Sequence, residues 1–245
     1  MRINFLGTNG WFNTHTGNTT CTFVETAAAY IILDAGGGLY KAFDLIKEHK
    51  PVYILLSHLH MDHIEGLQVM PLFKWKQGAT IIVGDGHKKE LENIMRLPYM
   101  PAPKDLNMPV EIVEVSAAKD LPFLLSTKRL EHIVPTIGYR IEAEGKVLTY
   151  ALDTGVSENA RELARDADIL ITECSYLPGQ SPNNNHLNPE QAAQLALEAN
   201  AKLLALIHFK ADDYNTIEKR DKAIAAAGHI FAHTYAPYDG DEVII

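Results

Sequence analysis

Three histidines and one aspartate occur within the six residues from His58 to His63, in the order His-x-His-x-Asp-His. In an extended segment, side chains two residues apart point the same way, so His58 and His60 can hold one ion together. A helix expected to begin directly afterwards turns Asp62 and His63 toward a neighbouring position. Imidazole and carboxylate groups suit Zn²⁺ first, with Mn²⁺ or Fe also possible. The spacing therefore predicts two ligands for each of two metal ions; the alternative is a polar turn whose histidines face water.

The residues on either side of this motif predict the structure that positions it. The apolar run 52–56 is typical of a buried parallel strand, and residues 64–73 have the apolar spacing of a helix. The motif is thus expected on the turn at the carboxyl end of a strand, where open α/β sheets place their ligands.

The remaining periodicities predict two β-rich halves, each covered by helices. Strands are expected at residues 2–6, 22–25, 30–33, 79–83, 110–115, 124–132, 137–144, 147–152, 169–173, 203–207, 229–233 and 242–245, and helices at 39–49, 87–97, 157–164, 189–200 and 217–227. No internal repeat or linker is evident. We therefore expect an α/β fold, a four-layer αββα sandwich formed by a single domain over residues 1–245.

The composition limits the classes of partner. Hydrophobic residues make up 47% of the 245 residues, which supports a substantial core, whereas 22 Lys and Arg stand against 31 acidic residues. Proteins that grip nucleic acid along its backbone usually show a basic surface, so the net charge of −9 disfavours extended nucleic-acid binding. The first residues hold too short an apolar run for a signal peptide, and no run reaches membrane-spanning length. Cys21 and Cys174 are too few for a disulfide framework, so we expect a cytoplasmic protein.

Further ligands must come from other strand ends, because the motif supplies only two for each metal. Three polar residues terminate apolar runs and are candidates: His132, Asp153 and His208. Each is expected at the carboxyl edge of a strand, as a shared site requires. A carboxylate such as Asp153 can bridge two cations.

This pattern resembles the metallo-β-lactamase superfamily over nearly the whole chain. The resemblance implies that the first metal is held by His58, His60 and His132. It implies that the second is held by Asp62, His63 and His208, with Asp153 bridging the two.

Within the superfamily, the chain is most similar to the ribonuclease Z branch and its small phosphodiesterase relatives. Residues 34–38 resemble the early Asp-x-Gly turn of that branch, and residues 132–139 resemble its third-histidine region. Glu173 ends a strand as the Glu-Ala-Thr segment of the branch does, and His186 falls where the branch carries an extra catalytic histidine. The resemblance implies catalytic roles for Asp62, His186 and Glu173.

His186 has two interpretations. In the first, it is a polar residue in an Asn-rich loop before a helix. In the second, it is a cationic donor aimed at a phosphate oxygen and oriented by Glu173. A carboxylate behind an imidazole fixes its tautomer and raises its pKa, which suits stabilising negative charge or protonating a leaving group.

The chain departs from true ribonuclease Z in one respect. That enzyme carries a long tRNA-gripping arm between its third metal histidine and its bridging aspartate. Here only twenty residues separate His132 from Asp153, and a tight hairpin is expected to fill them. With the acidic charge, this argues against pre-tRNA processing.

We therefore expect a dinuclear metal-dependent phosphodiesterase that acts on a small or cyclic phosphodiester or a short nucleic-acid end. Two alternatives are catalytic: an acyl hydrolase for thioesters, lactones or β-lactams, and a ribonuclease Z-type tRNA 3′ processing endonuclease. A third is a non-catalytic metal-binding or sensing protein. The resemblance also implies a homodimer, because relatives in this branch are often dimers.

Overall fold

The computed structural model describes all residues 1–245, and its first half forms a seven-stranded mixed sheet together with the last strand of the chain. Its members are β1 (Arg2–Gly7), β3 (Cys21–Glu25), β4 (Tyr30–Leu33), β5 (Val52–Leu55), β6 (Ala79–Val83), β7 (Val110–Glu114) and β15 (Glu242–Ile244). Their order is β15-β1-β3-β4-β5-β6-β7. Strand β5 pairs in parallel with both β4 and β6, as the apolar run that it contains predicts.

The second half forms a six-stranded sheet in the order β14-β12-β11-β10-β9-β8. Its strands are β8 (Leu124–Arg129), β9 (Ile137–Ala143), β10 (Lys146–Ala151), β11 (Ile169–Glu173), β12 (Leu204–Ile207) and β14 (Thr234–Tyr235). Strands β9 and β10 form the expected hairpin, whose turn contains Glu144 at φ 57° and Gly145 at φ 71°. Strands β10, β11 and β12 are parallel, so their carboxyl ends meet at one edge.

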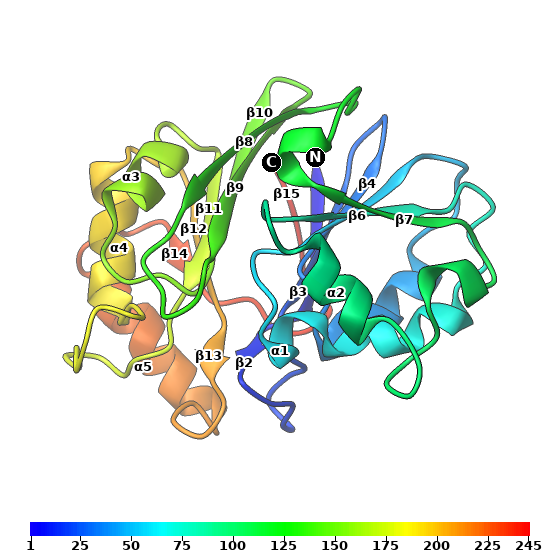
Figure 1. Cartoon of the computed structure of the whole chain (residues 1–245). Coiled ribbons are helices and arrows are strands. Elements are labelled where there is room, and N and C mark those ends of the chain that lie inside the picture. Colours follow the sequence, from blue (N-terminus) through cyan, green and yellow to red (C-terminus); the bar gives the residue numbers. More distant parts are fainter.

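The two sheets pack face to face, and helices cover both outer faces (Figure 1). Helices α3 (Glu158–Ala164), α4 (Pro189–Glu198) and α5 (Ile217–Gly228) cover the second sheet, while α1 (Met61–Ile64) and α2 (Lys88–Ile94) lie on the side of the first. Buried side chains from both sheets form the central layer, among them Ile3, Phe5, Leu33, Tyr139, Tyr150 and Ile171. The fold is therefore the predicted four-layer αββα sandwich. None of its helices combines the length and apolar character needed to span a bilayer.

A small parallel ladder joins the two halves at one end of the sandwich. It consists of β2 (Asn9–Gly10) and β13 (Phe209–Lys210), which pair Asn9 with Phe209 and Gly10 with Lys210. In Figure 1 the ladder lies at the lower end, between the two sheets. Strands of two residues leave no periodic signal in a sequence.

Four expected elements differ in the structure. The helix expected at 39–49 is instead a 3₁₀ segment, Gly37–Asp44, and it packs closely on β1: a Cβ on Gly38 would lie 2.3 Å from the Leu6 carbonyl oxygen. Residues 64–73 contain the 3₁₀ segment Glu65–Leu72, with Pro71 inside it.

The expected strand at 229–233 was wrong. These residues follow α5 and form a turn, and the sheet strand is the shorter β14. Ile230 and Phe231, which suggested a strand, pack against the core beneath the helices instead. The strand expected at 124–132 ends at Arg129, so His132 lies in the loop that follows it.

Candidate metal centre

The His-x-His-x-Asp-His motif lies on a turn between a strand and a helix, as predicted. His58 follows β5, His60 is extended at φ −63° and ψ 149°, and α1 begins at Met61. Helix α1 then carries Asp62 and His63 away from the direction of the first two histidines. The local change from extended chain to helix is what divides four neighbouring side chains between two positions.

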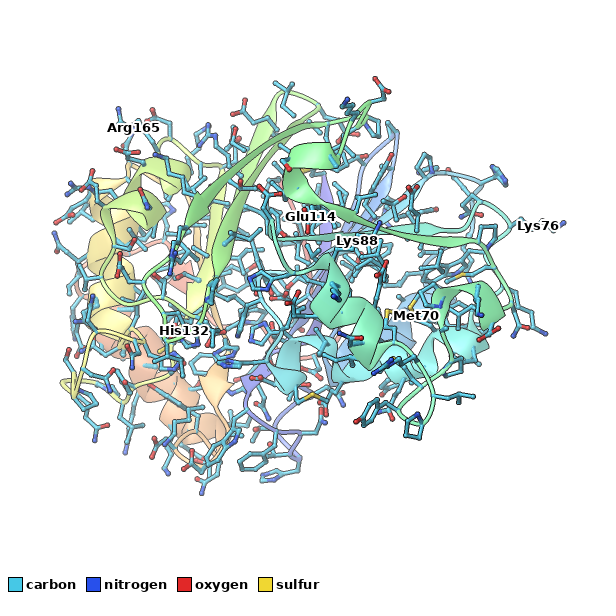
Figure 2. The ribbon with its side chains drawn as sticks, in the orientation of Figure 1. Met70, Lys76, Lys88, Glu114, His132 and Arg165 are labelled. Atoms are coloured by element: carbon cyan, nitrogen blue, oxygen red, sulfur yellow. The ribbon has the colours of Figure 1, made fainter.

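The structure brings all seven predicted ligands together. The donor atoms within each of two groups lie within 4.8 Å of one another: His58, His60 and His132 in the first, and Asp62, His63 and His208 in the second. The first group joins β5 to the loop after β8, and the second joins α1 to the end of β12. Figure 2 shows His132 toward the lower end of the sandwich, well away from Arg165 at the upper edge.

Asp153 lies between the two groups. Its Oδ2 atom is 2.8 Å from His63 Nε2 and 3.2 Å from His208 Nε2, and its Oδ1 atom is 3.7 Å from His132 Nε2. Asp153 and His208 follow the carboxyl ends of β10 and β12, the two parallel strands on either side of β11, with φ values of 51° and 53°. Left-handed backbone in a non-glycine residue costs about 1–3 kcal/mol and is concentrated at functional sites.

Hydrogen bonds to the protein fix which nitrogen of each buried imidazole faces the centre. The Asp34 carboxylate can only accept, so we assign the proton of the neutral His63 ring to Nδ1, which lies 2.8 Å from Asp34 Oδ2. Ser175 donates its hydroxyl to the His208 carbonyl and therefore accepts from His208 Nδ1 at 3.3 Å. Both Nε2 lone pairs then point to the same space, where they lie 3.2 Å apart.

The same reasoning applies to the first group. Ser57 donates to Asp34 Oδ2 and accepts from His58 Nδ1, while His132 Nδ1 donates to the Asn185 carbonyl. The Nε2 atom of His58 is buried and has no hydrogen-bond partner, and the same is true of Asp153 Oδ2. A buried polar atom without a partner costs about 1–3 kcal/mol.

These unpartnered atoms and converging lone pairs fit a pair of divalent cations. A nitrogen-and-oxygen donor set of this kind suits Zn²⁺, and accepts Mn²⁺ or Fe. The Asp34 carboxylate behind His63 is the type of support that orients a metal-ligating histidine. Asp34 also accepts from the Ser57 N–H at 2.7 Å and the Tyr150 hydroxyl at 2.9 Å, so its position is fixed.

The charges of the centre favour a cation. Burial would raise the pKa of Asp153, but His208 and His63 outweigh burial and hold that pKa well below its usual range. Burial would lower the pKa of His63, but Asp34, Asp62 and Asp153 raise it well above the ordinary value. By contrast, burial and then repulsion from His63 lower the pKa of His58. Carboxylates that draw protons to these nitrogens would hold a metal ion in place of the protons.

Glu173 and His186 form the predicted pair beside the centre. His186 Nδ1 lies 3.0 Å from both carboxylate oxygens of Glu173, and 3.7 Å from Asp153 Oδ1. Glu173 is fully buried at the end of β11 and accepts from the backbone N–H groups of Thr154 and Leu187. Burial would lower the pKa of His186, but Glu173 and then Asp153 raise it to about 9. An anchored carboxylate therefore favours the cationic form of this histidine.

The centre lies in a cavity of about 480 Å³. Its lining residues are Gly10, Trp11, His60, Met61, Asp62, His132, Ile133, Asp153, Ser175, His186, His208 and Lys210. A larger cavity of about 640 Å³ lies at the amino ends of β5, β6 and β7, and none of the candidate residues lines it. We place the chemistry in the smaller cavity because that is where the titratable groups converge.

Three contacts at this site were not predicted from the sequence. The backbone N–H of Trp11 donates to Asp62 Oδ2 at 2.7 Å, and Ser175 supports His208. Gly10 lies so close to the His208 ring that a Cβ there would fall 2.6 Å from it. Gly10 itself is the sequence signal for this close approach. The approach to His208 depends on the β2–β13 ladder. Histidines outside the motifs, such as His15, His49 and His233, are exposed and do not line this cavity.

Comparison with known proteins agrees with this fold. A sequence profile described as "Beta-lactamase superfamily domain" matches residues 30–209. The chain is 26% identical over 232 residues to ribonuclease Z of Bacillus mycoides (strain KBAB4), covering 70% of this chain and 76% of that protein. It is 24% identical over 216 residues to the probable metallo-hydrolase YhfI of Bacillus subtilis (strain 168), covering 85% and 86%.

Solved structures share the architecture over almost the whole chain. The crystal structure of YhfI from Bacillus subtilis has a TM-score of 0.79 at 20% identity, covering 99% of this chain and 98% of that one. The crystal structure of human tRNase Z, short form, has a TM-score of 0.77 at 20% identity, covering 100% of this chain and 99% of that one. The crystal structure of a diphosphatase from the PhnP family has a TM-score of 0.76 at 16% identity, covering 100% of this chain and 97% of that one. The chain belongs to the metallo-β-lactamase superfamily, and its histidine–aspartate centre is that of a metal-dependent hydrolase.

Proposed function

We propose that this hydrolase is a dinuclear metal-dependent phosphodiesterase acting on a small or cyclic phosphodiester or on a short nucleic-acid end. The observation that carries the proposal is the Glu173–His186 pair beside Asp153. A cationic donor beside the centre would serve both the charged oxygens of a phosphodiester and its alkoxide leaving group, whereas the carbonyl oxygen of an acyl substrate carries no charge before attack.

The assignment of ligands is part of this proposal. One cation would be held by His58, His60 and His132, the other by Asp62, His63 and His208, with Asp153 between them. Such a pair, when bound, would polarise the phosphate and acidify a water.

The other steps follow from the chain itself. Water attacks phosphorus while the bond from phosphorus to the leaving oxygen breaks, so that oxygen must receive a proton. His186 is held protonated by Glu173 and lines the cavity, so it is placed to supply that proton or to neutralise a phosphate oxygen. Buried Glu173 remains fixed by the N–H groups of Thr154 and Leu187 and acts through His186 as a positioning residue.

The hairpin and the charge support a small substrate. Strands β9 and β10 with their two-residue turn occupy the chain between His132 and Asp153, which leaves no arm to grip a folded RNA. The net charge of −9 opposes a long polyanion. The homologous ribonuclease Z proteins therefore support phosphodiester chemistry here more than they support tRNA as the substrate.

The experiment compares hydrolysis of bis-p-nitrophenyl phosphate, cyclic nucleotides and a chromogenic lactone by protein of measured metal content. We expect turnover of the diesters. His186→Ala should keep both metal ions and lower kcat by about 10²–10⁴-fold, because it removes a general acid without removing a ligand. Lost metal in this variant, or a lactone hydrolysed in preference to every diester, would contradict the proposal.

A further inference from the structure

Apolar side chains surround the mouth of the metal centre. Trp11 and Met61 are each 60% exposed, Ile133 is 68% exposed, and all three line the cavity. A single exposed apolar residue is ordinary on a protein surface, but three around one polar cavity form an apolar rim. Ligand sites combine such surfaces with a few polar groups that fix orientation. The rim is therefore positioned to contact a part of the substrate that does not react.

The backbone of Trp11 is fixed relative to the metal centre. Its N–H donates to Asp62 Oδ2 at 2.7 Å, and the preceding residue, Gly10, pairs with Lys210 in the β2–β13 ladder. Trp11 has φ 75°, a left-handed conformation that is rare for a bulky residue. Such a conformation persists only where the surroundings over-determine it, and it is concentrated at binding sites.

The indole is also held by its neighbours. The Phe12 ring contacts it edge to face at 5.1 Å, and Lys210 Nζ lies 5.8 Å from its centroid. The Lys210 ammonium also pairs with Asp212 at 3.1 Å and Asp213 at 2.9 Å, so its charge is already neutralised. Lys210 thus restrains the indole and offers little to an additional phosphate.

We propose that Trp11 determines specificity by stacking on the nucleobase of a nucleotide-type phosphodiester whose phosphorus lies at the metal centre. This inference rests on the proposed function and narrows its substrate class. Stacking on an aromatic side chain contributes roughly 5- to 150-fold in affinity per base, without selecting among bases. The cavity of about 480 Å³ suits one nucleotide, and the lack of a free cation at Lys210 argues against a substrate with a further phosphate there.

The test measures binding and needs no turnover. Metal-loaded protein is titrated with AMP, ribose 5-phosphate and phenyl phosphate, with calorimetry for Kd and tryptophan fluorescence for location. The only other tryptophan, Trp75, is buried and stacked on Phe73 at 4.1 Å, so quenching by a ligand at the cavity reports Trp11. We expect AMP to quench the emission and to bind at least about tenfold more tightly than ribose 5-phosphate.

Variants at Trp11 decide whether the indole causes this preference. Trp11→Ala should abolish the preference for AMP, whereas Trp11→Phe, which keeps an aromatic face, should retain most of it. Tyr99→Ala is the matched control, because Tyr99 is an aromatic residue that is 72% exposed and lies outside the cavity; it should leave the preference unchanged.

Three results would overturn the inference: equal binding of AMP and ribose 5-phosphate by the unmodified protein, an AMP preference that survives Trp11→Ala, or phenyl phosphate that binds as tightly as AMP. The last would assign the rim to aryl esters. The outcome is separable from that of the proposed function. Diesterase activity without an AMP preference refutes this inference alone, and an AMP preference without diesterase activity refutes the phosphodiesterase proposal.

Discussion

A buried aspartate lies at each end of the parallel strand pair β10–β11, and the two carboxylates have different partners. At the amino end of β11, Asp168 contacts Lys202 Nζ at 2.8 Å and Lys146 Nζ at 3.6 Å, and accepts from the Val147 N–H at 2.8 Å. At the carboxyl end of β10, Asp153 is surrounded by histidines, and its Oδ2 atom has no hydrogen-bond partner.

Asp168 is thus a carboxylate that stabilises the fold, whereas Asp153 is suited to binding an ion. The chain supplies its own cations to Asp168, so nothing from outside is needed there. At Asp153 the surrounding imidazoles present lone pairs, and the missing positive charge must come from protons or from metal ions. A charge left without a fixed partner inside a protein is costly, which makes this end of the sandwich the place where a ligand is required.

The largest effect is expected from Asp153→Asn. Removing the charge shared by both ligand groups should abolish binding of both metal ions and, with them, turnover. Metal content per chain, measured by plasma mass spectrometry after gel filtration, checks this. Asp168→Asn is the matched control and should keep the metal content and activity of the unmodified protein. If the Asp153→Asn variant still bound two metal ions, the proposed difference between Asp153 and Asp168 would be refuted.

An intermediate effect is expected from Asp34→Asn. Asp34 fixes His63 without touching the cavity, and loss of such a partner typically lowers metal affinity about 10–100-fold. Asparagine tolerates the φ of 56° at this position, so the backbone should be preserved. Competition with a chromogenic chelator measures the change. Tyr150→Phe removes a different donor to the same carboxylate, and an equally large loss in that variant would show that the His63 contact is not the cause.

The smallest effect is expected from Asp168→Asn on stability, at about 1 kcal/mol of unfolding free energy at neutral pH. Burial would raise the pKa of Asp168, but Lys202 and the Val147 N–H outweigh it and hold the pKa below its ordinary value of 3.8. The unfolded chain therefore takes up a proton at higher pH than the folded chain does. The stabilisation is fully present above pH 3.8 and is lost as pH falls through the lower, folded value.

Urea unfolding of both proteins at several pH values measures this difference. The gap between the unmodified protein and Asp168→Asn should be constant near neutral pH and should close in acid. A gap that widened in acid would contradict the role of the two lysines.

The parts predicted correctly from the sequence are those encoded locally. The spacing of His58, His60 and His63 fixes their arrangement through the backbone, because an extended segment followed by a helix has few possible geometries. Asp153 and His208 could be recognised because polar residues that end apolar strands fall at one edge of a parallel sheet. His186 and Glu173 were suggested by resemblance, and the structure brings them to 3.0 Å.

The parts missed depend on contacts between distant segments. The approach of Gly10 to His208 and of Trp11 to Asp62 follows from the β2–β13 ladder, which pairs residues about 200 positions apart. No periodicity marks a strand of two residues. At 229–233 the reverse error occurred, because apolar residues that pack beneath helices looked like a strand.

Anomalous diffraction from crystals soaked in Zn²⁺ or Mn²⁺ would show whether the seven side chains hold two cations. We expect two peaks. One should contact His58, His60 and His132, the other Asp62, His63 and His208, and Asp153 should contact both. A single peak that left Asp153 without a metal contact, or no peak within this cluster, would refute a dinuclear centre.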